Sequence, residues 1–110
     1  MEIKNSRQNR AVIVTLGGRM DAATAPDFEK QCAALIQAGE KLLVIDMAGL
    51  AYISSAGLRS ILAAAKALKA QQGDIRFCNL QGMVSEVFSI SGFSSMFAIH
   101  ETLDRALADT

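Results

Sequence analysis

The segment that most constrains the fold is an apolar run followed by two serines and then by a helical pattern. The run Leu42–Ile45 has too few polar residues to alternate, which predicts a central strand, Leu42–Met47, covered on both faces. Beyond the serines, apolar residues recur at helical spacing at Leu58, Ile61, Leu62, Ala65 and Leu68. This spacing predicts a helix from about Ser55 to Gln72. Ser54 and Ser55 are therefore expected where the exit loop of a strand meets the start of a helix.

The start of a helix has its own chemistry. It offers unpaired backbone N–H groups and the positive end of the helix dipole. Such a position suits a serine that caps the helix, and it equally suits a phosphate. Two interpretations of Ser55 follow from the residues. Either Ser55 caps the helix while Gly57 permits close packing, or Ser55 is a switch whose state is written by a phosphate.

The rest of the chain alternates between strand and helix patterns. The expected elements run in the order β, β, α, β, α, β, α, β, α, at Met1–Ser6, Ala11–Leu16, Asp21–Gly39, Leu42–Met47, Ser55–Gln72, Ile75–Cys78, Gly82–Ser91, Met96–Ile99 and Thr102–Ala108. Helices between strands imply parallel neighbours with right-handed crossovers, and the leading hairpin adds an antiparallel edge. The fold class is therefore α/β, with a mixed four- to five-stranded sheet and about four helices in layers.

Start and stop signals mark the first expected helix. Thr24 is placed as its N-cap, Pro26 falls in its first turn, and Asp27 takes the capping-box position. Gly39 closes the helix. Before it, the doublet Gly17-Gly18 is expected to end the preceding strand.

Size and charge exclude several classes of protein. The chain has 110 residues, which suits a single domain, 1–110. Its eleven basic and eleven acidic residues cancel, which argues against a nucleic-acid binder and against an anionic membrane surface as partner. The polar start Met1–Ser6 shows no signal peptide, and no apolar run is long enough to span a bilayer. We therefore expect a cytoplasmic protein without membrane insertion.

Residues that could carry enzymatic chemistry are scattered. His100 is the only histidine and is expected at the end of the last strand, without an acidic residue to orient it. Cys32 and Cys78 fall on apolar faces, and no zinc-ligand spacing is present, so they are interpreted as small buried hydrophobes. The sequence predicts no catalytic residue, no metal and no cofactor.

Two carboxylates and three large apolar residues have more than one interpretation. Asp21 and Asp46 are expected either at the rim of the sheet near Ser55 or as acceptors in local turns. The three apolar residues are expected either in an apolar surface patch or in the core, and the core is preferred; they are Met83, Met96 and Phe97.

Four segments together carry a resemblance to a known family. They are Gly18–Asp21, Leu43–Asp46, Tyr52–Leu58 and Val87–Phe93. Over essentially its whole length the chain resembles a STAS domain of the anti-sigma factor antagonist type. The resemblance implies a mixed sheet with helices largely on one side, which agrees with the element order derived above.

The resemblance also implies a bacterial partner-switching function. In this family the serine two residues before the glycine of the turn is phosphorylated, which is Ser55 here. The implied partners are an anti-sigma factor that is a serine kinase with a histidine-kinase-like ATPase fold, and a metal-dependent serine phosphatase of the PPM type. The implied docking surface comprises Asp21, Ser54, Ser55, Gly57, Leu58 and Arg59.

Two residues depart from the family pattern. Ser54 stands where many members have aspartate, and Ala56 stands where Ser or Thr is common. Ser54 is therefore a second possible phosphate acceptor, although Ser55 keeps its spacing to Gly57. The missing aspartate gives some support to an alternative, a structural STAS subunit of a transporter or scaffold complex that needs no phosphorylation. A sensor of a small molecule, such as a nucleotide or lipid, is a third alternative, although no phosphate-binding loop is visible.

Overall fold

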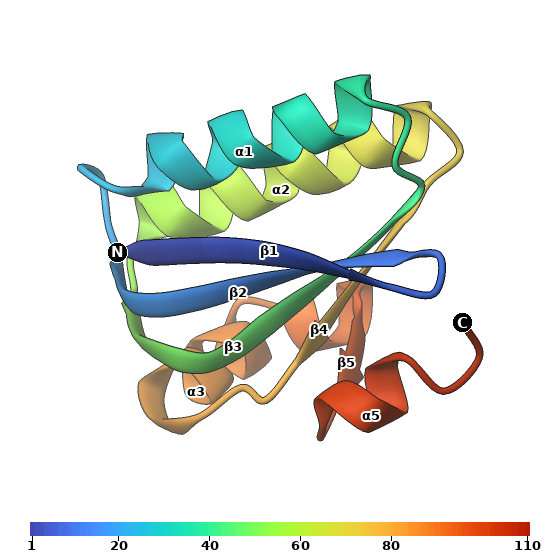
Figure 1. Ribbon diagram of the computed structural model, residues 1–110. Coiled ribbons are helices and arrows are strands. Elements are labelled where there is room, and N and C mark those ends of the chain that lie inside the picture. The colour runs from blue at the N-terminus through green and yellow to red at the C-terminus, as the bar shows by residue number, and fades with distance from the viewer.

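The computed structural model describes residues 1–110 and contains one five-stranded mixed sheet (Figure 1). Across the sheet the strands follow the order of the chain, β1-β2-β3-β4-β5. β1 and β2 are antiparallel, and every later pair is parallel. The strands are β1 Glu2–Gln8, β2 Ala11–Met20, β3 Leu42–Ile53, β4 Asp74–Cys78 and β5 Ala98–His100. The predicted α/β class and mixed sheet are confirmed.

Four of the five helices share one face of the sheet. The helices are α1 Ala25–Gln37, α2 Ser55–Ala70, α3 Gly82–Ile90, α4 Phe93–Met96 and α5 Leu103–Ala106. α1 and α2 lie side by side over the sheet (Figure 1), and buried residues of α1 to α4 belong to one main cluster. α5 packs against the opposite face. None of these helices combines the length and the apolar character needed to cross a bilayer.

The second and third strands are longer than the sequence predicts. β2 continues past Gly17 and Gly18 to Met20, and β3 continues to Ile53. The ladder between them shifts register around these glycines. A Cβ atom on Gly49 would lie 3.0 Å from the carbonyl oxygen of Leu16, so glycine permits close approach of the two backbones. The prediction that Gly17-Gly18 ends the strand is wrong, because here the glycines form irregularities within the ladder.

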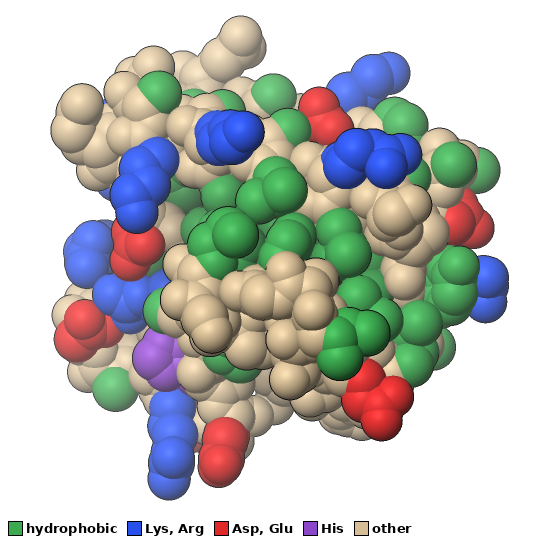
Figure 2. Space-filling model, turned by 180° about the vertical axis from the view of Figure 1, so that it is seen from behind, with side chains coloured by type: hydrophobic (Ala, Val, Ile, Leu, Met, Phe, Trp, Pro, Cys, Tyr) green, Lys and Arg blue, Asp and Glu red, His purple; other side chains and the backbone are tan.

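Some hydrophobic side chains reach the surface. Met96, which the sequence assigns to the core, is 58% exposed, and Ile90 is 85% exposed. Met83 and Phe97 are half-buried. Figure 2 shows hydrophobic side chains gathered across the middle of one face of the molecule. The assignment of Met96 to the core is wrong because α4, a single turn that the sequence did not reveal, buries Phe93 instead.

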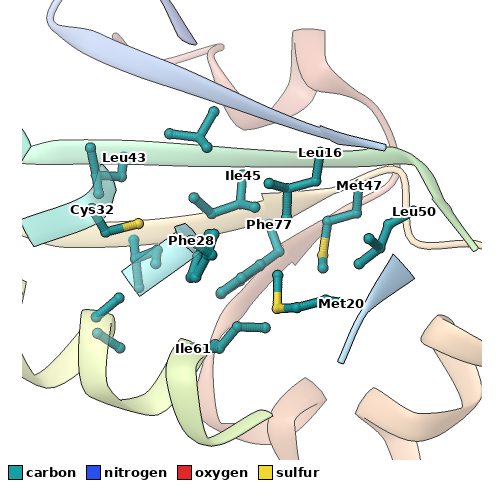
Figure 3. Close-up of a cluster of buried hydrophobic side chains, with 14 of the residues drawn as sticks. Leu16, Met20, Phe28, Cys32, Leu43, Ile45, Met47, Leu50, Ile61 and Phe77 are labelled. Atoms are coloured by element: carbon teal, nitrogen blue, oxygen red, sulfur yellow. The ribbon is translucent and has the colours of Figure 1, made fainter. Parts of the chain in front are cut away.

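The core occupies both faces of the sheet. Along β3, Leu43 and Ile45 point into the main cluster beneath the helices, whereas Leu42 and Val44 belong to the cluster beneath α5. All four are fully buried, which confirms a central strand covered on both sides. Figure 3 shows the main cluster, where side chains from the sheet meet Met20 and the helices. This packing fixes the end of β2 relative to α2.

The two cysteines behave as buried hydrophobes. Cys32 and Cys78 are fully buried and unpaired. Burial raises the pKa of each thiol to about 12, with further contributions from the nearby Glu29 and Asp46 carboxylates respectively. Both thiols are therefore protonated and unreactive at neutral pH. His100 ends β5 in a half-buried position, as predicted.

Candidate functional site

The turn that begins α2 is built by Ser54, not by Ser55. Ser54 has extended backbone angles and is the N-cap; its hydroxyl accepts a hydrogen bond from the N–H of Gly57 at 3.3 Å. Its own N–H donates to the carbonyl of Met20 at 2.9 Å. The interpretation of Ser55 as the cap is therefore wrong. β3 runs directly into this position without an exit loop, so the N-cap falls one residue earlier. We call Ser54–Gly57 the serine turn.

Ser55 is left free by this arrangement. It is the first residue of α2, it is exposed, and its hydroxyl makes no hydrogen bond within the protein. The first turn of α2 contains no acidic residue. An anion attached to Ser55 would therefore meet the positive end of the helix dipole with no acidic side chain in the same helical turn.

Gly57 sets how closely the serine turn approaches the sheet. A Cβ atom on this buried glycine would lie 2.7 Å from Cγ1 of Ile53 and 3.1 Å from the carbonyl oxygen of Met20. Both neighbours end strands, and they are paired across the sheet. Because Gly57 has no side chain, the serine turn can pack directly on the ends of β2 and β3. The exposed residues around Gly57 present their side chains to solvent.

Asp21 lies at the same end of the sheet, in the turn from β2 to α1. Its carboxylate accepts hydrogen bonds from the N–H groups of Ala23 at 3.0 Å and Thr24 at 3.2 Å. Partial desolvation raises the pKa of Asp21, but these bonds, the Thr24 hydroxyl and nearby Arg19 outweigh it and lower the pKa overall. Asp21 is thus ionised at neutral pH. It lies beside the serine turn, because the preceding residue, Met20, accepts a hydrogen bond from the N–H of Ser54.

The start of α1 differs from the prediction in two respects. α1 begins at Ala25 rather than at Asp21. The Asp21 carboxylate accepts hydrogen bonds from the N–H groups of Ala23 and Thr24, and these bonds keep residues 21–24 in a turn. Thr24 is the N-cap residue, as predicted, but its hydroxyl bonds the N–H of Asp21 and the carbonyl of Arg19 instead of the helix. The predicted capping box with Asp27 is therefore absent.

Asp46 does not reach the serine turn. It lies within β3, opposite Thr15 and Cys78, and the strand continues to Ile53. Its carboxylate accepts hydrogen bonds from the side-chain amide of Asn79 at 3.0 Å and from the N–H of Ala48 at 3.1 Å. The prediction that Asp46 shares the rim with Ser55 is wrong because it assumed that the strand ends at Met47. The alternative, a local acceptor, describes its contacts.

The first turns of α2 add an apolar and a basic side chain to the surface. Leu58 is half-buried against the main cluster, and Arg59 is exposed. Arg59 takes part in none of the ion pairs of the structure. It follows Ser55 by four residues, which places the two side chains on the same face of the helix.

A cation–π contact at the end of the sheet was not predicted. The Arg19 guanidinium lies 4.0 Å from the centroid of the Tyr52 ring, across the ladder between β2 and β3. The two residues belong to the segments Gly18–Asp21 and Tyr52–Leu58, which the sequence had marked. The contact was missed because the sequence did not predict that β2 and β3 continue far enough to pair these two segments.

A family model for the STAS domain matches residues 2–106, and the chain belongs to the STAS domain family. Its relatives assign it to the anti-sigma factor antagonist type. The chain is 39% identical over 108 residues to the Bordetella bronchiseptica protein BtrV, named as an anti-sigma factor antagonist, covering 98% of this chain and 93% of BtrV. It is 22% identical to the anti-sigma-B factor antagonist of Staphylococcus aureus, covering 92% and 94% of the two chains.

Solved structures share the fold. An anti-sigma factor antagonist from Mycobacterium paratuberculosis superposes with a TM-score of 0.88 at 23% identity, covering 97% of this chain and 91% of that one. The antagonist SpoIIAA in its unphosphorylated form superposes with a TM-score of 0.76 at 16% identity, covering 98% and 96%. These likenesses establish the STAS fold, with its mixed sheet and helices, for this chain.

Proposed function

We propose that this protein binds an anti-sigma factor while the Ser55 hydroxyl is free and releases it when Ser55 is phosphorylated. Sigma-factor-dependent transcription is then regulated by partner switching. Residues 1–110 act as one STAS domain, which is a substrate of the kinase and not itself an enzyme. The observation that carries the proposal is the exposed, unbonded Ser55 side chain at the first position of α2.

The docking surface surrounds the serine turn. Ser54, Ser55 and Arg59 provide polar contacts, Leu58 provides an apolar one, and ionised Asp21 lies at the adjacent turn. Gly57 contributes by holding this surface against the sheet. The partner we propose is an anti-sigma factor with a histidine-kinase-like ATPase fold. Its interface packs around an uncharged hydroxyl at Ser55.

Phosphorylation would change this surface without unfolding it. The Ser55 Oγ attacks the γ-phosphorus of ATP bound to the partner, ADP leaves, and the hydroxyl proton is released. The phosphoserine carries roughly −1.5 to −2 charges. It is tolerated at the helix start, and Arg59 is close enough along the helix to pair with it. A hundredfold loss of partner affinity needs only about 2.7 kcal/mol, which a desolvated phosphate in the interface can supply. A metal-dependent serine phosphatase restores the hydroxyl by hydrolysis.

Binding of the purified anti-sigma factor to Ser55 variants tests the proposal. We expect Ser55→Ala to bind within about threefold of the wild type, and Ser55→Asp to bind about a hundredfold more weakly, by calorimetry. Ser6→Asp adds the same charge on exposed β1 and is the matched control. Equal affinities for Ser55→Ala and Ser55→Asp would contradict the switch and favour a structural subunit of a transporter or scaffold complex.

Phosphosite mapping separates the two adjacent serines. After incubation with the partner and ATP, we expect one phosphate on Ser55 and none in Ser55→Ala. Ser54 is the poorer acceptor because its oxygen already caps α2 and the residue is half-buried. Phosphate on Ser54 in the wild type would show that the acceptor has been assigned to the wrong serine.

A further inference from the structure

A groove of about 540 Å³ lies between the second half of α2 and strands β4 and β5. Its apolar lining includes Leu62, Ala65, Ile75, Met96 and Phe97. Figure 2 shows the face that carries it, with hydrophobic side chains across the middle and lysine or arginine side chains along the border above them. The volume falls within the range of pockets that hold small organic ligands.

One wall of the groove is held in place by aromatic packing. The Phe97 ring lies 5.3 Å from the ring of Phe77 and 5.4 Å from that of Phe93, measured between centroids. Phe77 is fully buried, so this wall is anchored to the core. Met96 is exposed and unbranched, and it can adapt to the shape of an occupant. The groove is thus preformed at its base and adjustable at its mouth.

The border of the groove is positively charged. Lys66 and Lys69 both line it, stand three residues apart on α2, and are exposed. Neither takes part in an ion pair. Asp74, the one carboxylate on the lining, lies 3.6 Å from the guanidinium of Arg76 and also accepts a bond from the N–H of Ile75. The ammonium groups of Lys66 and Lys69 therefore border the apolar lining of the groove without an ion-pair partner in the protein.

Neither lysine hydrogen-bonds the carbonyls at the end of α2. The carbonyl of Leu68 accepts hydrogen bonds from the N–H groups of Gln71 and Gly73. A different lysine, Lys41, donates to the carbonyl of Gln71. Because the terminal carbonyls have these donors, Lys66 and Lys69 remain available to a ligand.

We propose that this groove binds a single-chain amphiphile with a carboxylate headgroup, a fatty acid in monomeric form. The alkyl chain lies along the apolar floor, and the carboxylate sits between Lys66 and Lys69, away from Asp74. Burial of the chain supplies affinity, and the two ammonium groups select the charged headgroup. The site is separate from the serine turn, because Lys66 lies eleven residues beyond Ser55, about 16 Å along the helix axis.

Titration of the full chain with dodecanoate below its micelle concentration tests the site. We expect saturable binding of one molecule, and no binding of butyrate, which keeps the charge but lacks the chain. Lys66→Glu combined with Lys69→Glu should weaken binding at least tenfold. Lys4→Glu combined with Lys30→Glu makes the same change in net charge at exposed positions outside the lining, and should change affinity less than twofold.

A second variant tests the groove without changing its charge. Ala98→Phe places a ring into the lining from exposed β5 and should also weaken binding at least tenfold, with an unchanged circular dichroism spectrum. Absence of saturable binding, or equal binding by all variants, would overturn the proposal. So would binding to phosphatidylglycerol vesicles without binding of monomeric dodecanoate, which would make this face a membrane contact. Ser55→Ala should bind dodecanoate normally, so the test is independent of the proposed switch.

Discussion

Two helices begin at the same end of the sheet, and their starts are built differently. Met20 and Ile53 are paired at the ends of β2 and β3, and α1 and α2 follow them. The start of α1 is organised by the carboxylate of Asp21, whereas the start of α2 is capped by the neutral hydroxyl of Ser54. One junction already carries negative charge and the other has none in its first turn. An added phosphate therefore changes the electrostatics of the second junction most.

The largest expected effect comes from the third helical position of each start. This position is Gly57 in α2 and Asp27 in α1. Gly57→Val should destabilise the fold by about 3 kcal/mol, because its side chain would collide with Ile53 and with the backbone of Met20. Asp27→Val, at an exposed site, should cost about 1 kcal/mol or less through loss of an acid near the helix dipole. Urea unfolding measures both. Equal losses would show that the α2 junction is no more tightly packed than that of α1.

A smaller effect distinguishes the two serines. Ser54→Ala removes the cap of α2 and should destabilise the protein by about 1 kcal/mol. Ser55→Ala removes an exposed hydroxyl without a partner and should change stability by about 0.5 kcal/mol or less. The measurement is the urea midpoint of each variant at constant m-value. A larger loss for Ser55→Ala than for Ser54→Ala would reverse the assignment of the cap.

The smallest effect depends on pH and belongs to the α1 junction. Folding lowers the pKa of Asp21, so its contribution to stability is present above the unfolded pKa of about 3.9 and is lost as pH falls through the folded pKa. Asp21→Asn should therefore be less stable than the wild type at pH 7, and the difference should narrow at pH 3. Ser54→Ala should show no such narrowing, since its cap is uncharged. A difference for Asp21→Asn that is the same at both pH values would exclude the ionised carboxylate as its cause.

The sequence predicted the order and class of the elements because their apolar patterns are strong. Burial leaves a local pattern of apolar residues that can be read directly from the sequence. Examples are the run Leu42–Ile45 and the helical spacing from Leu58 to Leu68. The ends of β2 and β3 were missed for the opposite reason. Gly17 and Gly49 look like strand breakers in isolation, yet they pair within the ladder, where Gly49 lets the two backbones approach one another. That contact is between distant parts of the chain and leaves no local pattern.

The candidate site was partly predictable for a similar reason. The helical apolar spacing from Leu58 onward placed the two serines at a helix start, and Asp21 does lie at that end of the sheet. The choice of cap between Ser54 and Ser55 required the backbone angles, because either serine can accept the bond. The position of Asp46 required the true length of β3. The groove beside Phe97 required the placement of α2 relative to β4 and β5, which no single segment encodes.

The order of the strands has a consequence for how the chain acquires its structure during synthesis. Each strand pairs with the one made just before it, so no later strand has to enter between two earlier ones. The β1–β2 hairpin can form first on a nascent chain, and every following unit extends the sheet in the same direction. Docking of α5 and the residues after it has to follow their synthesis; there Arg76 donates hydrogen bonds to the carbonyl of Ala106 and the carboxylate of Asp109. Until those residues leave the ribosome, the apolar side chains of Leu42 and Val44 on that face lack the cover that α5 provides.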